Sequence, residues 1–310
     1  AMGSPTEMLE PEEIERRFGW VDSFEGDGTD DVIMRDLLAA ALLKTGGHAG
    51  PDDWAAEWKA NHATIFGEKT DRFFPSILHI VEKLARGYPP SVLSLGTMPT
   101  TTSAMSITPV GLVNAGHPRA AAAQARHIAS LVHVHENAFC QDAAAAVAAA
   151  VAAALIPGAN VGTVLDAAFA AVAGWGSEEM RVLMQDARSL AESSKDFRTF
   201  RAAYNKRFRR AVMCDSRETV PATFALIWLA GGDADKAVML SANFGRDADT
   251  IGCMAGGICG ALQGPGGTAA ARLAQLSPHV HDLQVEMAVS LSALARGKAA
   301  TEQAAWGSHL

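Results

Sequence analysis

The sequence predicts an all-α protein, a compact single-domain bundle of many helices, and two observations support this prediction. Stretches with apolar residues at helical spacing follow one another along the 310 residues, many of them opened by proline and closed by glycine. Runs of alternating β-branched and aromatic residues, the pattern typical of strands, are absent, and aromatic residues make up only 6% of the chain.

The expected helices can be followed in order. Pro11 opens the first, PEEIERRF, and Gly19 follows it. The second, DDVIMRDLLAAALLK, has an apolar stripe at helical spacing and stops before Gly46. Further helices are expected at residues 51–67, 74–87, 117–133, 143–156, 160–174, 177–193, 196–212, 218–231, 233–243 and 248–262, and near the C-terminus. Residues 100–111, rich in hydroxyl groups, and the glycine-rich 264–267 are expected to be loops.

No linker rich in proline, serine or charge divides the chain, so one domain is expected from residue 5 to residue 297. Residues 1–4, AMGS, resemble a cloning remnant, and residues 298–310 are expected to form a tail.

Composition bears on the partners and the compartment. The net charge is −8, and the one basic run, KRFRR at 206–210, has the spacing of a solvated helix face, so no nucleic-acid partner is expected. The apolar run 143–156 is too short to span a membrane, and no secretory signal is visible. Four cysteines without paired spacing fit reduced thiols and a cytoplasmic location.

Two acidic clusters precede expected helices at distant places in the chain. The first is Thr29-Asp30-Asp31, and the second comprises Asp247, Asp249 and Thr250. Carboxylate and hydroxyl oxygens are hard ligands that suit Mg²⁺ or Mn²⁺. If the fold brought the two helix starts together, cations would remove the repulsion between the acids.

Two other interpretations remain open at this level. Each cluster alone could cap its own helix. His133, His135 and Cys140 could bind zinc, although their spacing is poor for a structural zinc site. Nucleophile-elbow, Walker and Rossmann glycine motifs are absent.

Taken together, the motifs resemble those of the ADP-ribosylglycohydrolases, a family that includes the dinitrogenase reductase-activating glycohydrolases. Its early T-D-D-T motif appears as TDDV, and its late G-G-D-T-D-T-I motif, followed by a glycine-rich helix, as GRDADTIGCMAGG. The segments AMSITPVG, LVHVHEN and ETVPATFALIWLAGGD match further family motifs in order and spacing. The resemblance covers residues 5–265.

The resemblance implies an all-α fold and two Mg²⁺ or Mn²⁺ ions. By motif position, the metal ligands would be Thr29, Asp30, Asp31, Asp247, Asp249 and Thr250. The catalytic residues would be Glu7, Asp31 and Asp249, although the family helix that precedes the Glu7 motif is missing from this sequence. The residues expected to contact the substrate are Thr101, Thr102, Ser103, Met105, His133 and Arg246.

This sequence departs from the family pattern around the substrate. Threonines stand where the family's diphosphate loop has glycine and asparagine, Ser106 replaces an arginine, and Arg246 replaces a glycine. The resemblance implies hydrolysis of an N-ribosyl bond, by default on an ADP-ribosylated protein side chain. A small ribosylated nucleoside or nucleotide, a non-catalytic binding or structural role, and phosphohydrolase chemistry with the same metals remain alternatives.

Overall fold

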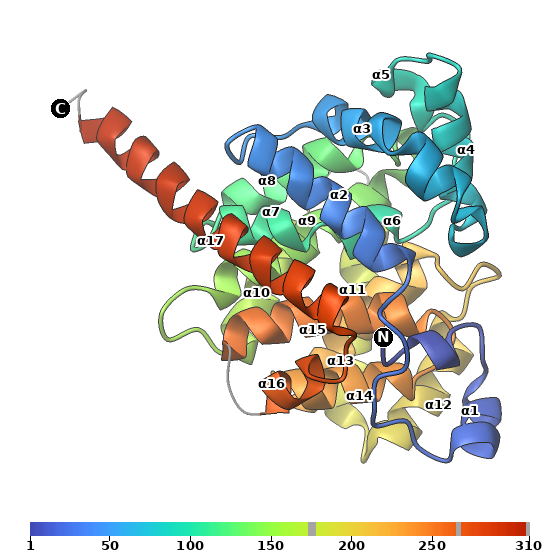
Figure 1. Ribbon diagram of the computed structural model, residues 1–310. Coiled ribbons are helices and arrows are strands. Elements are labelled where there is room, and N and C mark those ends of the chain that lie inside the picture. The colour runs from blue at the N-terminus through green and yellow to red at the C-terminus, as the bar shows by residue number, and fades with distance from the viewer. Residues whose placement is uncertain (173–177, 265–267, 308–310) are drawn as a thin grey trace.

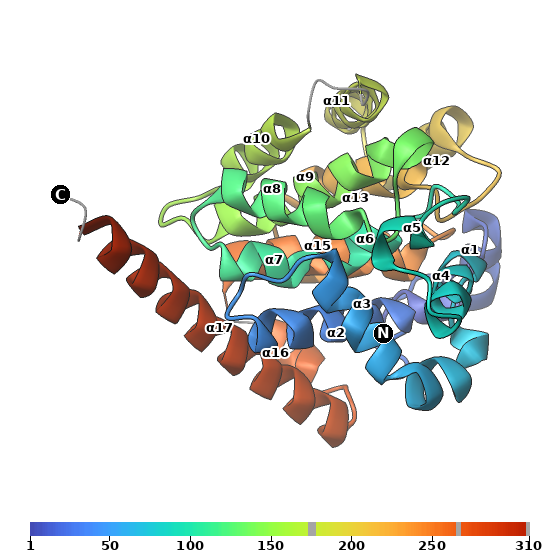
Figure 2. The same ribbon diagram turned by 90° about the horizontal axis from the view of Figure 1, so that it is seen from above.

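The computed structural model describes residues 1–172, 178–264 and 268–307, with backbone alone for 268–270 and 305–307. The described residues form helices and no strand, and the only β-type pairing among them is an isolated bridge between Thr100 and Asp215. The all-α prediction is therefore confirmed. Figures 1 and 2 show the helices packed in layers, with the last helix projecting from the body.

The first half of the fold runs through nine helices. These are α1 (Pro11–Phe18), α2 (Asp30–Lys44), α3 (Pro51–Ala60), α4 (Pro75–Ala85), α5 (Pro90–Leu93), α6 (Thr102–Ser106), α7 (Thr108–Val113), α8 (Pro118–Ala129) and α9 (Ala138–Ala154). Single 3₁₀ or π turns lie at Ser4–Thr6, His62–Gly67, Thr70–Arg72 and His135–Asn137.

The second half continues in the same way. Its helices are α10 (Val161–Ala171), α11 (Glu178–Ser193), α12 (Phe197–Phe208), α13 (Ser216–Ala230), α14 (Ala234–Ala242), α15 (Ala248–Gln263), α16 (Thr268–Leu273) and α17 (Pro278–Gly307). The turn expected at 264–267 lies outside the described residues apart from Gly264.

Helix α9 is the central helix of the bundle. It packs against α6, α7, α8, α10, α13 and α15, and every residue from Ala143 to Ala154 is buried. Alanine at most of these positions allows the neighbouring helices to approach closely from all sides. By length and composition the stretch His135–Ala154 could cross a membrane, but 89% of its apolar window is buried inside this protein, as the sequence led us to expect for a core helix.

The loop predicted at 100–111 is wrong in part, because α6 and α7 occupy most of it. All five residues of α6 are buried, and the Ser106 hydroxyl donates to the carbonyl of Thr102 one turn earlier, at 2.8 Å. Tertiary packing thus outweighs the low helix propensity of the hydroxyl residues.

The residues at both expected limits of the domain have a defined structure. Met2 is 1% exposed, and a side chain at Gly3 would collide with the backbone of Asp249. At the other end, α17 runs continuously through the boundary expected at residue 297.

The glycines of α15 are explained by close helix packing. A Cβ at Gly256 would lie 3.0 Å from Val238 of α14, and one at Gly257 would lie 2.8 Å from Thr108 of α7. Glycine at these positions lets α15 approach both neighbours closely.

Candidate metal centre

The starts of α2 and α15 meet in space. Carboxylate oxygens of Asp30, Asp31 and Asp249 lie within 4.8 Å of one another, and so do those of Glu7, Asp247 and Asp249. Asp249 belongs to both groups and joins them. The fold therefore brings together five carboxylates from the N-terminal segment and from two helices that are far apart in the sequence.

Helix capping does not account for these acids. Thr29 and Asp247 occupy the N-cap positions of α2 and α15, and neither forms a side-chain capping hydrogen bond. The Thr29 hydroxyl instead donates to Asp31 Oδ2, at 3.0 Å. Side chains that could have capped their helices face the acidic cluster.

Burial and mutual repulsion dominate the electrostatics of the cluster. Burial, then the charges of Asp249 and Asp30, raise the pKa of Glu7 to about 7. Burial and Asp249 likewise raise the pKa of Asp30 to about 7, although backbone amides partly oppose this. The pKa values of Asp31 and Asp247 are raised well above their usual range by burial first and by Asp249 second. Without positive charge, the site strongly disfavours full ionisation of its acids.

The donor set fits divalent cations. Three buried carboxylate oxygens, Asp31 Oδ1, Asp247 Oδ2 and Asp249 Oδ1, have no hydrogen-bond partner in the protein. Buried polar atoms are normally paired, so orphaned oxygens indicate a missing ligand. A cavity of about 30 Å³, of ionic size, lies beside two of these residues, Asp31 and Asp247, and is also bordered by Asp30 and Thr250. Oxygen-only ligands favour Mg²⁺ or Mn²⁺.

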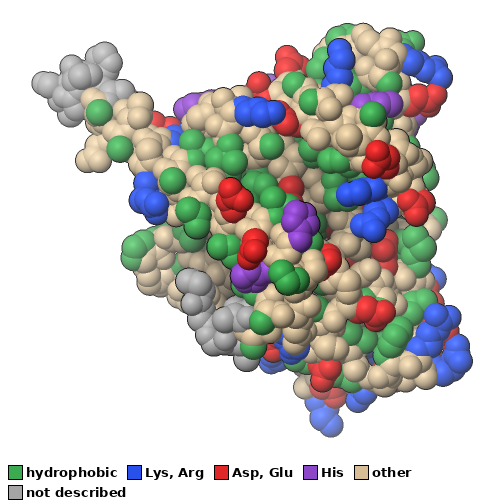
Figure 3. Space-filling view, in the orientation of Figure 1, with side chains coloured by type: hydrophobic (Ala, Val, Ile, Leu, Met, Phe, Trp, Pro, Cys, Tyr) green, Lys and Arg blue, Asp and Glu red, His purple; other side chains and the backbone are tan. Residues whose placement is uncertain are grey.

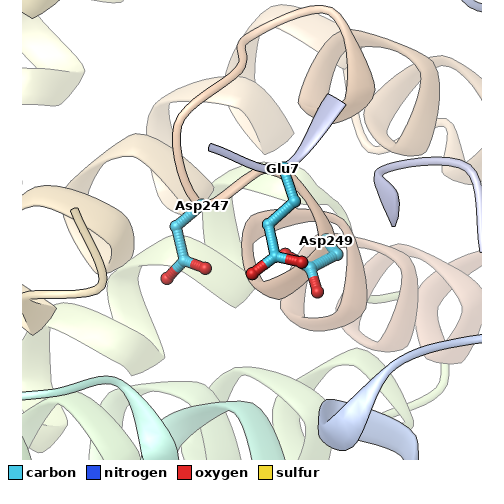
Figure 4. A group of neighbouring side chains, drawn as sticks. All are labelled: Glu7, Asp247 and Asp249. Atoms are coloured by element: carbon cyan, nitrogen blue, oxygen red, sulfur yellow. The ribbon is translucent and has the colours of Figure 1, made fainter. Parts of the chain in front are cut away.

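The N-terminal segment carries Glu7 into this cluster. A 3₁₀ turn, Ser4–Thr6, is closed by Thr6, whose amide and hydroxyl both donate to the carbonyl of Gly3. Gly3 abuts the backbone of Asp249, so the residue after the turn lies at the start of α15. Figure 4 shows the carboxylates of Glu7, Asp247 and Asp249 directed into the same space.

Two larger cavities adjoin the cluster. The wider one, about 840 Å³, is bordered by Glu7, Thr29 and Asp30 and by the segment Asp71–Pro75. Another of about 350 Å³ lies between α2, α15 and α17, and Asp31 and Asp249 border it. Glu7 and Asp30 border both the ion-sized cavity and the wide cleft, so the cleft leads to the acids.

The residues expected to contact substrate divide into two sets. Thr101, Thr102 and Met105 border the ion-sized cavity. Ser103 and His133 are fully buried and bonded to each other, from Ser103 Oγ to His133 Nδ1, at 2.9 Å. They border none of the cavities described above. Their contact holds the segment 100–103 against the residues that follow α8.

Arg246 is likewise not brought to the cleft. Its guanidinium forms two hydrogen bonds with the buried carboxylate of Glu218, at 2.8 and 3.0 Å, and one with the carbonyl of Arg210, at 2.9 Å. A contact with substrate would require breaking a buried ion pair. In this structure Arg246 forms a buried ion pair beside Asp247, and its expected contact with substrate stays a prediction.

The zinc alternative finds no support in the geometry. Both ring nitrogens of His133 are within hydrogen-bond distance of hydroxyl groups, those of Ser103 and Thr100. In the part of the chain that the structure describes, two groups of three His, Cys, Asp or Glu side chains could hold a metal ion. They are the two carboxylate groups described above, and neither contains His or Cys.

Sequence reasoning missed several residues that border the site. Phe74 lines both the ion-sized cavity and the cleft, and Arg35, four residues after Asp31, lines the cavity beside α15. The four-residue spacing of an arginine after an acid could have revealed Arg35, because such residues share a helix face. Nothing in the sequence around Phe74 indicates its place in the cleft.

Comparison with known proteins agrees with this fold and site. The family model described as ADP-ribosylglycohydrolase matches residues 1–303. The chain is 27% identical over 300 residues to the uncharacterized protein YegU of Escherichia coli strain K12, covering 85% of this chain and 84% of YegU. A solved structure titled "ADP-ribosylglycohydrolase-related protein complex" superposes with a TM-score of 0.68 at 21% identity, covering 95% of this chain and 93% of that one, and shows the same fold.

Proposed function

Because this chain belongs to the ADP-ribosylglycohydrolase family, we propose that it is a metal-dependent hydrolase that cleaves an N-ribosyl bond. The supporting observation is the acidic cluster, which contains three unpaired buried carboxylate oxygens and borders a substrate-sized cleft through Glu7 and Asp30. The default substrate is a protein side chain that carries ADP-ribose.

We further propose that two Mg²⁺ or Mn²⁺ ions are held by the two helix starts. The ligands are Thr29, Asp30, Asp31, Asp247, Asp249 and Thr250, of which Asp30, Asp31, Asp247 and Thr250 border the ion-sized cavity. Bound divalent ions would neutralise the carboxylates and stabilise charge on the ribosyl group.

The protein's own residues supply the proton transfer and the orientation. Glu7 borders both the cleft and the ion-sized cavity, so its carboxylate can accept a proton from a water that attacks C1 of the ribose. The bond between C1 and the leaving nitrogen breaks, and the nitrogen departs with the electron pair and takes up the proton that the attacking water released. Asp31 and Asp249 complete the catalytic set, because their buried carboxylates fix the position of the reacting ribose.

One observation favours a second candidate, a small ribosylated metabolite. The threonine hydroxyls of the loop that would cradle a diphosphate are bonded within the protein. Thr101 Oγ1 donates to the carbonyl of Cys214, and Thr100 Oγ1 lies within hydrogen-bond distance of Ser76, Thr102 and His133. A loop whose hydroxyls are already paired offers less to a diphosphate than a glycine-rich loop does.

The surface is consistent with the absence of a nucleic-acid partner, which stays a prediction. On the face in Figure 3, Lys and Arg side chains are dispersed among acidic and hydrophobic ones. Within the basic run, Arg207, Arg209 and Arg210 form ion pairs with acidic side chains. A cytoplasmic location also stays a prediction, and the four free cysteines are compatible with it.

Product analysis tests the proposal. The protein is incubated with Mg²⁺ or Mn²⁺ and with ADP-ribosylated proteins, ADP-ribose esters, or simple nucleosides and nucleotides, and the products are identified by mass spectrometry. Release of ADP-ribose or ribose supports the hydrolase, and release of inorganic phosphate alone supports a phosphohydrolase. An Asp249→Ala control must lose the activity. If no substrate is cleaved although the metals bind, the non-catalytic alternative is favoured.

A further inference from the structure

A short backbone pairing joins the residues that follow Glu7 to the loop that precedes α15. The Met8 amide donates to the carbonyl of Arg246, at 2.7 Å, and the Arg246 amide donates to the carbonyl of Leu9, at 2.8 Å. Met8 directly follows Glu7, and Arg246 directly precedes Asp247. The pairing therefore fixes two carboxylates of the cluster relative to each other.

Both partners in this pairing adopt a backbone conformation that non-glycine residues rarely take. Met8 has φ of 63° and Arg246 has φ of 61°, and they are two of the three such residues in the part of the chain that the structure describes. Left-handed backbone in residues with a side chain costs free energy and persists only where the surroundings enforce it. Some other interaction must hold the two segments in this arrangement.

The side chain of Arg246 provides that interaction. Its guanidinium is paired with Glu218 of α13, which is 1% exposed and also accepts the Arg210 amide, at 2.6 Å. A bidentate pair fixes the guanidinium in orientation as well as position. Glu218 lies on a long buried helix, so the pair anchors the loop before α15 to the core.

We infer that Arg246 is a positioning residue, which acts through the ion pair with Glu218 to hold Asp247 and Glu7 at their places in the metal centre. The inference rests on the proposed function for the effect of Arg246 on catalysis. Its effects on metal affinity and on the order of the backbone can be measured without turnover. The inferred role differs from one in which Arg246 contacts the substrate.

The test compares Arg246→Gly, Glu218→Gln and the double variant with the wild type. Glycine adopts the left-handed conformation without strain, so Arg246→Gly removes the ion pair and leaves the backbone geometry accessible. The double variant avoids leaving a buried carboxylate unpaired. Arg126→Ala/Asp142→Asn, which removes the ion pair between α8 and α9, is the matched control for general loss of stability.

Two readouts do not require turnover. Titration with Mn²⁺ should show affinity weakened by about 10–100-fold in the Arg246 and Glu218 variants and unchanged in the control, the range typical for residues that orient metal ligands. Hydrogen exchange at the Met8 and Arg246 amides should become faster only in the same variants. For a cleaved substrate, kcat should fall with little change in KM, whereas a substrate-contacting arginine would raise KM.

Each result decides the inference. Wild-type Mn²⁺ affinity and wild-type amide protection in the Arg246→Gly/Glu218→Gln variant would overturn it. If the double variant does not fold, Arg246→Lys, which keeps the charge and loses the bidentate geometry, is measured in the same way. If the wild-type protein cleaves none of the substrates, the proposed function fails while Mn²⁺ affinity still tests Arg246. If it binds no Mn²⁺, amide exchange decides alone.

Discussion

Asp30 and Asp249 lie in the first turns of two helices that are far apart in the sequence, and carboxylate oxygens of the two residues lie within 4.8 Å of each other. A buried and a partly buried carboxylate at this distance repel unless one is protonated or a cation lies nearby. The unpaired oxygens of Asp31, Asp247 and Asp249 favour the cation.

Removing divalent metal should destabilise the protein. After chelation, addition of Mg²⁺ or Mn²⁺ to about 100 times its dissociation constant should stabilise the fold by about 2.7 kcal/mol, which raises the melting temperature by roughly 4 °C for a chain of this length. Asp249→Asn should lose most of this shift. Because the substitution removes one repelling carboxylate, the metal-free variant should melt no lower than the metal-free wild type. Asp52→Asn, at an exposed position of α3, should respond to metal as the wild type does. An equal metal response in Asp249→Asn would argue against the site.

Glu7→Gln should separate catalysis from metal binding. If Glu7 accepts the proton from water, the amide lowers kcat by about 10²–10⁴-fold, while Mn²⁺ affinity stays within a few fold of the wild type. Glu12→Gln, in the exposed first turn of α1, should change neither quantity. Loss of Mn²⁺ binding together with kcat would instead make Glu7 a metal ligand.

The glycines of α15 should differ sharply in their tolerance of alanine. A Cβ at Gly257 would lie 2.8 Å from Thr108, whereas one at Gly260 would meet nothing within 4 Å. We therefore expect Gly257→Ala to reduce the free energy of unfolding by about 1–3 kcal/mol. Gly260→Ala should raise it by up to about 1 kcal/mol through helix propensity. Denaturant unfolding of the two variants checks this. Equal effects at both positions would mean that close packing does not explain the glycine at 257.

The predictable and the unpredictable parts of the site differ in one respect. Each acidic cluster is contiguous in sequence and stands at a helix start, so its ligand types and local setting could be predicted from the chain alone. The role of Arg246 could not, because it depends on Glu218, a residue of another helix whose side chain faces inward. The hydrogen-bond partners of His133 could not be predicted for a similar reason, since Ser103 and Thr100 become its neighbours only in the folded protein.

The fold shows the same distinction. Helices opened by proline, such as α4 and α8, begin at the residues that the sequence indicates, because the capping signals are local. Helix α6 has no such signal at its start, and all five of its residues are buried between neighbouring helices. Helix α7 carries Pro109 in its first turn, a local signal that the interpretation of this stretch as a loop overlooked.

The buried His133 should make stability depend on pH. Burial lowers its pKa from 6.5 to about 3, so the folded protein holds the ring neutral, while the unfolded chain protonates it near pH 6.5. The stabilisation is complete above pH 6.5 and is lost as the pH falls towards 3. Lowering the pH from 8 to 5 should therefore cost about 2 kcal/mol through this residue. Denaturant unfolding of His133→Asn measures it: the variant should be less stable than the wild type at pH 8, and the difference should shrink by about 2 kcal/mol at pH 5. Titration of the acidic cluster, common to both proteins, cancels in the difference. A difference that stays constant from pH 8 to 5 for His133→Asn would mean that the pKa of the ring is the same in the folded and the unfolded protein, against the effect of burial.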